Sequence, residues 1–75
     1  MTKFIEVTEM CMTKSGKYEP IHTLLINTDT IYCFYDCDGI FTEITFKCEY
    51  EKGVKTIDVA ESFEKIKKML AIPEN

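Results

Sequence analysis

The chain has 75 residues, a formal net charge of −4 and a sequence pI of about 4.9. Its length predicts one domain, residues 1–75, and its 45% hydrophobic and 29% charged content excludes a disordered chain. The acidic charge and the lack of arginine in the sequence argue against unaided binding to a nucleic-acid backbone or to an anionic membrane surface.

The amino-terminal part of the sequence predicts a hairpin. Residues 3–12 are rich in apolar and β-branched side chains, and residues 21–26 form a shorter segment of the same kind. The sequence Lys14-Ser15-Gly16-Lys17 between them is typical of a turn, because glycine reaches positive φ without steric cost. We therefore expect two antiparallel strands joined by this turn.

The middle of the chain predicts a second hairpin. Residues 31–35 are an unbroken apolar and aromatic run. Residues 41–49 are the cleanest predicted strand, with Ile44, Phe46 and Cys48 alternating with polar side chains. The sequence Asp36-Cys37-Asp38-Gly39 lies between them, and Asp-Gly is a strong hairpin signal. These two segments are the third and fourth predicted strands.

In the last third of the chain, the spacing of the apolar side chains changes from that of a strand to that of a helix. Residues 54–59 alternate as a fifth strand, whereas the apolar side chains of residues 62–71 recur at the spacing of an amphipathic helix. Ser62 is the expected N-cap of this helix, and Pro73 is expected to end it.

This order of elements predicts an α+β fold. We expect a five-stranded antiparallel meander, as a curved sheet or partial barrel, with one C-terminal helix packed on one face. A helix this short is marginally stable alone, so its apolar stripe must be buried on the sheet.

The third predicted strand is apolar on both faces, because successive side chains of a strand point to opposite sides. Strict alternation divides it into two sets, one with Tyr32 and Phe34 and the other with Ile31, Cys33 and Tyr35. We expect the helix to cover one set, which then meets Ile44, Phe46 and Ile57. The other set is expected to meet a second subunit or a partner, so the predicted interface residues are Tyr32, Phe34, Tyr35 and Phe41.

The polar residues do not form a recognisable catalytic or metal-binding signature. Cys33 and Cys37 are a close pair, but the second pair of a structural zinc site is missing from the sequence. Asp36 and Asp38 are better explained by the hairpin turn than by a cation site, and His22 by a place at the surface or on an edge strand. We therefore expect no metal, no cofactor and no enzymatic activity.

The aromatic side chains allow two interpretations. They could form a platform that stacks bases or a ligand ring, or they could supply the core and an oligomer interface. The acidic charge favours the core and interface. The residues concerned are Tyr18, Tyr32, Phe34, Tyr35, Phe41 and Tyr50.

The cellular location is predicted from the amino terminus and the cysteines. Glu6 and Glu9 interrupt the only short apolar stretch near the start, and no segment of the sequence is long enough for a transmembrane helix. We expect a cytoplasmic protein without a membrane segment. Its cysteines are then expected to be reduced and mostly buried, with Cys33 and Cys48 as neighbours in the core and Cys37 exposed in a turn.

Two segments resemble a group of small bacterial and phage proteins of unknown function. Leu25-Ile26-Asn27 followed by Ile31 resembles an "LINxxxI" turn before a sheet, and residues 59–70 resemble a closing "V-x-E-S-Y/F-E-E-I" helix. Small flagellar and swarming-motility proteins, and the sheet-and-helix unit of LytTR-type DNA-binding domains, are similar more loosely. The resemblance implies a fold, and a LytTR-like unit would imply DNA contact through basic loops.

Three functions follow as hypotheses. The first is a non-enzymatic interaction module that self-associates through its sheet as a homo-oligomer. The alternative is a phage or mobile-element accessory protein that binds a host protein or sequesters a small ligand between subunits. The second alternative is a nucleic-acid-binding regulator, which the acidic charge disfavours. It requires one surface stripe of Lys47, Lys52, Lys55, Lys65, Lys67 and Lys68.

Overall fold

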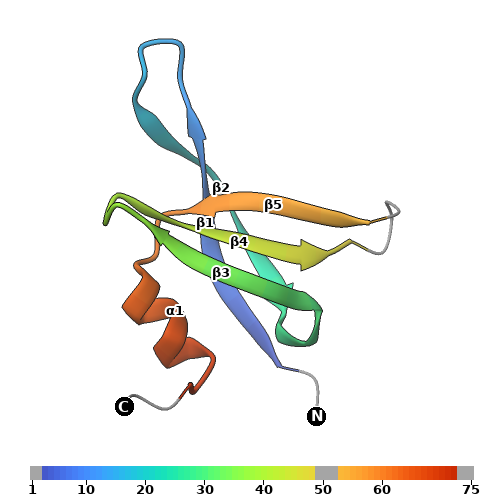
Figure 1. Cartoon of the computed structure of the whole chain (residues 1–75). Coiled ribbons are helices and arrows are strands. Elements are labelled where there is room, and N and C mark those ends of the chain that lie inside the picture. Colours follow the sequence, from blue (N-terminus) through green and yellow to red (C-terminus); the bar gives the residue numbers. More distant parts are fainter. Residues whose placement is uncertain (1–2, 49–52, 73–75) are drawn as a thin grey trace.

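The computed structural model describes residues 3–48 and 53–72, which form five strands, a short 3₁₀ turn and one helix (Figure 1). The elements are β1 (Phe4–Met12), β2 (Tyr18–Asn27), η1 (Thr28–Thr30), β3 (Ile31–Cys37), β4 (Phe41–Lys47), β5 (Val54–Val59) and α1 (Phe63–Met69). The predicted α+β class, with five antiparallel strands and one C-terminal helix, is confirmed.

Some boundaries differ from those expected. β2 begins at Tyr18 and so includes Pro20, which is tolerated because β2 lies at an edge of the sheet. β3 continues to Cys37, two residues beyond the expected end, whereas β4 ends at Lys47.

The strands form one open sheet in the order β2-β1-β5-β4-β3. A β1–β2 hairpin and a β3–β4–β5 meander are joined by a short antiparallel ladder, in which Glu9 pairs with Val59 and Met10 with Asp58. Figure 1 shows the hairpin crossing the three strands of the meander. β2 and β3 are therefore the two edge strands of the described sheet.

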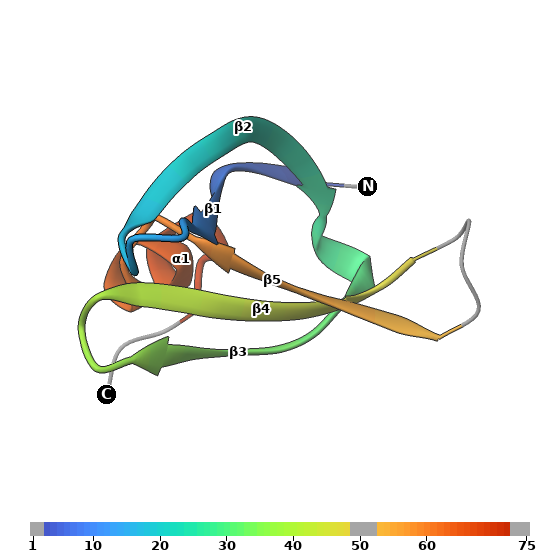
Figure 2. The same ribbon diagram turned by 90° about the horizontal axis from the view of Figure 1, so that it is seen from above.

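The core lies between these two layers, which face one another when the molecule is seen from above (Figure 2). Among residues 3–48 and 53–72, every buried hydrophobic side chain is aliphatic. These residues are Ile5, Val7, Ile26, Ile44, Ile57, Val59 and Ile66. Ile66 is the only one from α1, so this side chain anchors the helix to the sheet.

The Asp-Gly turn between β3 and β4 forms as predicted. Asp38 and Gly39 both have positive φ, 53° and 73°, and the Ile40 N–H donates to the Cys37 carbonyl at 3.0 Å. The loop has three residues, numbers 38–40, because Cys37 pairs with Phe41. Two consecutive positive φ values within it match the twist of the strands that the loop connects. Asp36 also accepts a hydrogen bond from the Gly39 N–H, at 3.0 Å.

The helix begins as predicted and ends differently. The Ser62 hydroxyl accepts from the Lys65 N–H at 3.1 Å, which makes Ser62 the N-cap. At the other end Ala71 has a φ of 57°, and the Ile72 N–H donates to the Lys67 carbonyl at 3.0 Å. This is the hydrogen-bond pattern of a Schellman motif, with alanine where glycine is usual. The expected stop at Pro73 lies outside the described residues.

The two-set division of the third strand is wrong. The β3–β4 register shifts between Ile31 and Cys33, so an extra residue, Tyr32, interrupts the alternation. As a result Ile31 and Phe34 both pack against the core cluster, although strict alternation places them on opposite faces. Tyr32, Cys33 and Tyr35 are exposed.

Candidate functional site

The aromatic side chains remain at the surface. Of the phenylalanines and tyrosines that the structure describes, none is buried. Phe4, Tyr32 and Tyr35 are exposed, and Tyr18, Phe34, Phe41, Phe46 and Phe63 are half-buried. Aromatic side chains contribute strongly to both cores and interfaces, so this distribution directs attention to the surfaces that carry them.

Strand β3 brings three of these side chains to one edge of the sheet. β3 pairs with β4 on one side and with no other described strand. Its residues Ile31–Cys37 include neither proline nor lysine, which are common protective devices of edge strands. The opposite edge strand β2 carries Pro20, and its register with β1 shifts next to it. β3 is thus the less protected of the two edges.

A groove of about 560 Å³ lies between β3 and the end of the helix. Phe34 and Phe63 meet in it, with ring centroids 5.1 Å apart and planes tilted by 40°. The groove lining is Thr28, Ile31, Tyr32, Cys33, Phe34, Phe63, Leu70 and Ile72. It therefore runs beside the exposed edge and is mostly apolar.

The four predicted interface residues do not form one surface. Tyr32 and Tyr35 are 63% and 47% exposed. Phe34 packs inward against the helix, while Phe41 stacks on Tyr18 with ring centroids 4.6 Å apart. Tyr32, Phe34 and Tyr35 lie on the edge strand β3, whereas Phe41 lies on β4. The contribution of Phe63 to the groove was missed, because the sequence pattern alone assigned this residue to the helix stripe.

The side chains of Tyr35, Cys37 and Glu43 form a hydrogen-bonded group on the outer face of the sheet. The Tyr35 hydroxyl donates to Glu43 Oε1, and the Cys37 thiol lies 3.9 Å from Glu43 Oε2. The bond to Glu43, followed by partial desolvation, raises the pKa of Tyr35 to about 12. Partial desolvation and then the Glu43 charge raise the pKa of Cys37. A raised pKa disfavours the thiolate, so this cysteine is poorly suited to nucleophilic catalysis.

A second carboxylate lies beside this group. Asp58 on β5 is the direct cross-strand partner of Glu43 on β4. Partial desolvation, followed by the charges of Glu43 and Glu9, raises the pKa of Asp58. Like charges opposite each other in a sheet are destabilising. No set of three or more side chains suited to hold a metal ion was found in the parts of the chain that the structure describes.

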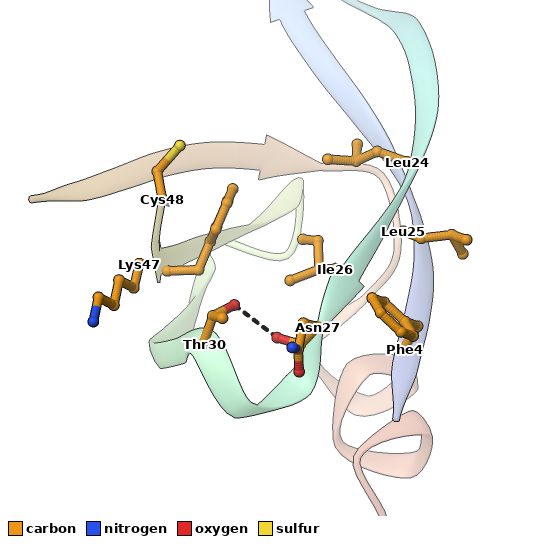
Figure 3. A pocket seen from close by; sticks show the side chains of 9 residues that line it. Phe4, Leu24, Leu25, Ile26, Asn27, Thr30, Lys47 and Cys48 are labelled. Carbon is orange, nitrogen blue, oxygen red and sulfur yellow. Dashed lines mark hydrogen bonds between the residues drawn. The ribbon is translucent and has the colours of Figure 1, made fainter. Parts of the chain in front are cut away.

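A different groove, of about 380 Å³, opens between the end of β2 and the end of β4 (Figure 3). Leu24 and Ile26 point into it, whereas Leu25 and Phe4 lie on the other side of β2 (Figure 3). Two of its polar residues serve the turn η1: Asn27 Oδ1 accepts from the Asp29 N–H at 2.9 Å, and the Thr30 hydroxyl donates to the Asn27 carbonyl at 2.7 Å. These bonds stabilise the turn.

The cysteines differ from what was expected. All four are free thiols, but none is buried: Cys11 and Cys33 are exposed, and Cys37 and Cys48 are half-buried. Cys33 pairs with Thr45 across the sheet, not with Cys48. Cys37 ends β3 and is not an exposed turn residue. For Cys33, the apolar context in the sequence does not reveal that its strand lies at an edge of the sheet.

His22 is an exposed residue of the edge strand β2, as predicted, and its Nε2 lies 2.9 Å from Glu9 Oε1. The proposed lysine stripe is interrupted. In the β4–β5 ladder, Lys47 pairs with Val54 and Lys55 pairs with Phe46. Lys47 and Lys55 therefore belong to adjacent residue pairs, whose side chains point to opposite faces of the sheet. Lys52 lies outside the described residues.

Among the residues that the structure describes, no helix has the length and apolar character that a membrane span requires. Comparison with protein-family models, with curated proteins and with solved structures found no match. The resemblance to small bacterial and phage proteins stays a prediction.

Proposed function

We propose that this chain is a small non-enzymatic interaction module that self-associates along the edge of β3. The observation that carries the proposal is the juxtaposition of an edge strand without proline or lysine with an apolar groove. A strand added to a sheet edge gains backbone hydrogen bonds, and side-chain pockets beside the edge give specificity. The edge of β3 and the groove lined by Phe34 and Phe63 offer both.

The side chains at the edge fit this role. Tyr32 and Tyr35 are large, exposed and have few rotatable bonds, so little entropy is lost when they enter an interface. The core contains no aromatic side chain among the described residues, and interface burial would cover apolar surface that the small core leaves uncovered.

A non-enzymatic role is supported by the chemistry of the polar group on the outer face. The raised pKa of Cys37 disfavours its thiolate, and the neighbouring carboxylate of Glu43 is engaged by Tyr35. His22 is exposed and pairs with Glu9. It lies on β2, at the edge of the sheet opposite to β3, which carries Cys37. A cytoplasmic location is part of the proposal, because the four free thiols suit a reducing compartment.

The test is the mass of the protein in solution. Sedimentation equilibrium from micromolar to millimolar concentration should give a mass that rises above the 8.7 kDa of one chain. Tyr32→Lys should shift this equilibrium toward the monomer, because a charged side chain is placed on the edge. Val54→Lys is the matched control: Val54 is 56% exposed and lies on β5, which β4 separates from β3.

Circular dichroism should show that both variants keep the wild-type fold. A wild-type mass of one chain at every concentration would overturn the proposal. An equal effect of Tyr32→Lys and Val54→Lys would overturn the assignment to the β3 edge.

A further inference from the structure

We infer that two copies of this chain exchange their β1–β2 hairpins in a domain-swapped dimer, in which the hairpin of each copy completes the sheet and the core of the other. The turn η1 is the hinge of this exchange. The exchange is independent of the proposed pairing of β3 edges, because its contacts are those that a single chain already makes between its own two halves.

The hairpin and the meander are two halves that share one core. Figure 2 shows them as two facing layers. The hairpin contributes Ile5, Val7 and Ile26 to the buried side chains. The meander and the helix contribute the others, which are Ile44, Ile57, Val59 and Ile66. A hairpin that leaves its meander therefore exposes apolar surface on both halves, and another copy of the same chain supplies the surface that fits it.

Specific contacts fix how the hairpin sits on the meander. The short β1–β5 ladder aligns the two backbones. The Thr8 N–H and hydroxyl donate to the carboxylate of Glu61, and the Tyr18 ring from β2 stacks on the Phe41 ring from β4. These contacts join the same residues whether the two halves belong to one chain or to two, so the monomer itself sets the register of the exchanged pair.

A turn of three residues connects the halves. η1 (Thr28–Thr30) leads directly from β2 to β3, the two opposite edge strands. Its bonds are to the hairpin: the Thr28 N–H and hydroxyl both donate to the Lys3 carbonyl, at 2.9 and 3.0 Å, and the Asp29 N–H donates to Asn27 Oδ1 at 2.9 Å. Straightening this turn separates the hairpin from the meander and leaves the strand pairing within each half intact.

The length of the hinge sets the balance between monomer and exchanged dimer. Both forms contain the same core, ladder and stacked rings, so these contacts favour neither. The monomer is favoured because its two halves are tethered and meet at a high effective concentration. The exchanged dimer is favoured because a short hinge bridges the halves of one chain only as a tight turn.

The first experiment changes the hinge. Each variant is refolded from urea at millimolar protein concentration, and monomer and dimer are separated by size-exclusion chromatography with light scattering. Deletion of Asp29 should raise the dimer-to-monomer ratio about tenfold, because the shorter hinge no longer spans the halves of one chain. Insertion of Gly-Ser-Gly-Ser after Asp29 should lower this ratio, since the longer hinge closes without a tight turn. The same insertion after Ser15, within the β1–β2 turn, is the matched control and should leave the ratio unchanged.

A disulfide shows which chain supplies the hairpin. Glu9 and Val59 are the close pair of the β1–β5 ladder, because the Ala60 N–H donates to the Thr8 carbonyl at the position before them. Glu9→Cys and Val59→Cys are introduced together in a chain whose four native cysteines are replaced by serine, and the separated monomer and dimer are oxidised with oxidised glutathione. The disulfide should join two chains in the dimer and should lie within one chain in the monomer, as a non-reducing gel reports.

The matched control is a disulfide within the meander. Glu43 and Asp58 are cross-strand partners on β4 and β5, so Glu43→Cys with Asp58→Cys should give a disulfide within one chain in both species. Circular dichroism of every variant reports any loss of fold separately.

The outcomes separate the exchange from the proposed pairing of β3 edges. A dimer whose Glu9→Cys and Val59→Cys disulfide lies within one chain overturns the exchange, as does a ratio that does not respond to hinge length or a chain that stays monomeric after concentrated refolding. Tyr32→Lys should weaken edge pairing and leave the exchanged dimer unchanged, because Tyr32 is exposed on the far edge of the meander. A dimer that Tyr32→Lys abolishes, with the disulfide within one chain, leaves edge pairing standing alone.

Discussion

Glu61 holds Thr8 with both oxygens of its carboxylate. Oε1 accepts from the Thr8 backbone N–H at 2.7 Å, and Oε2 accepts from the Thr8 hydroxyl at 3.0 Å. The neighbouring Ala60 N–H donates to the Thr8 carbonyl at 2.9 Å. These bonds join the segment between β5 and α1 to β1, next to the two residue pairs that link the hairpin with the meander.

Replacing Glu61 by alanine should lower the free energy of unfolding by about 2 kcal/mol, because two hydrogen bonds to a charged acceptor are lost together. Glu61→Gln should cost less, since the amide oxygen still accepts one bond. Urea denaturation measures both. Glu6→Gln, at an exposed position of β1, is the matched control and should change stability little. Equal stability of Glu61→Ala and the wild type would mean that solvent replaces these bonds without loss.

Replacing Ala71 by glycine should stabilise the protein by about 0.5 kcal/mol. Ala71 has a φ of 57°, which is costly for a residue with a Cβ atom, and the gain is reduced because glycine is more flexible in the unfolded chain. Thermal denaturation measures the difference. Ala60→Gly is the control, because Ala60 is not among the residues with positive φ, and this variant should be destabilised.

Cys37 should react with iodoacetamide more slowly than Cys11 and Cys33 at mildly alkaline pH. It is half-buried, and its raised pKa leaves less thiolate, whereas the other two side chains are exposed. Peptide mass spectrometry at successive times gives the three rates. Glu43→Gln should accelerate the reaction at Cys37 and leave the rate at Cys11 unchanged. Faster labelling of Cys37 than of Cys33 in the wild type would contradict the expected order.

Asp58→Asn should stabilise the protein at neutral pH, by no more than about 0.5 kcal/mol because the side chain is partly solvated. The pKa of Asp58 is raised above its ordinary value of 3.8 in the folded state, so the folded protein binds this proton more tightly than the unfolded chain does. The destabilisation by ionised Asp58 is therefore complete above the raised pKa and is relieved as the pH falls through it toward 3.8.

The pH dependence of this difference is the measurement. Urea denaturation of the wild type and of Asp58→Asn, at a series of pH values from neutral to acidic, should give curves that converge at low pH. A stability difference that is independent of pH would exclude ionisation of Asp58 as its cause.

The local patterns of the sequence predicted most of the helices and strands. They did not predict features that depend on how the strands pair. The Asp38-Gly39 turn and the Ser62 cap formed as expected because each depends on a few adjacent residues. The division of residues 31–35 into two sets failed because the register shift after Ile31 depends on the pairing with β4. The exposure of Cys33 and the Phe34–Phe63 contact depend on the place of β3 in the sheet, which no single segment encodes.

The three-residue turn η1 connects β2 and β3, which lie at opposite edges of the sheet. Each half of the chain is therefore built from contacts between neighbours in sequence, and the closure of a long loop is delayed until β1 meets β5. Such local contacts form quickly, whereas loop closure carries an entropic cost that only later contacts offset. This connectivity predicts an order of assembly: we expect hairpin and meander to form independently and to dock last, through the pairs Glu9–Val59 and Met10–Asp58.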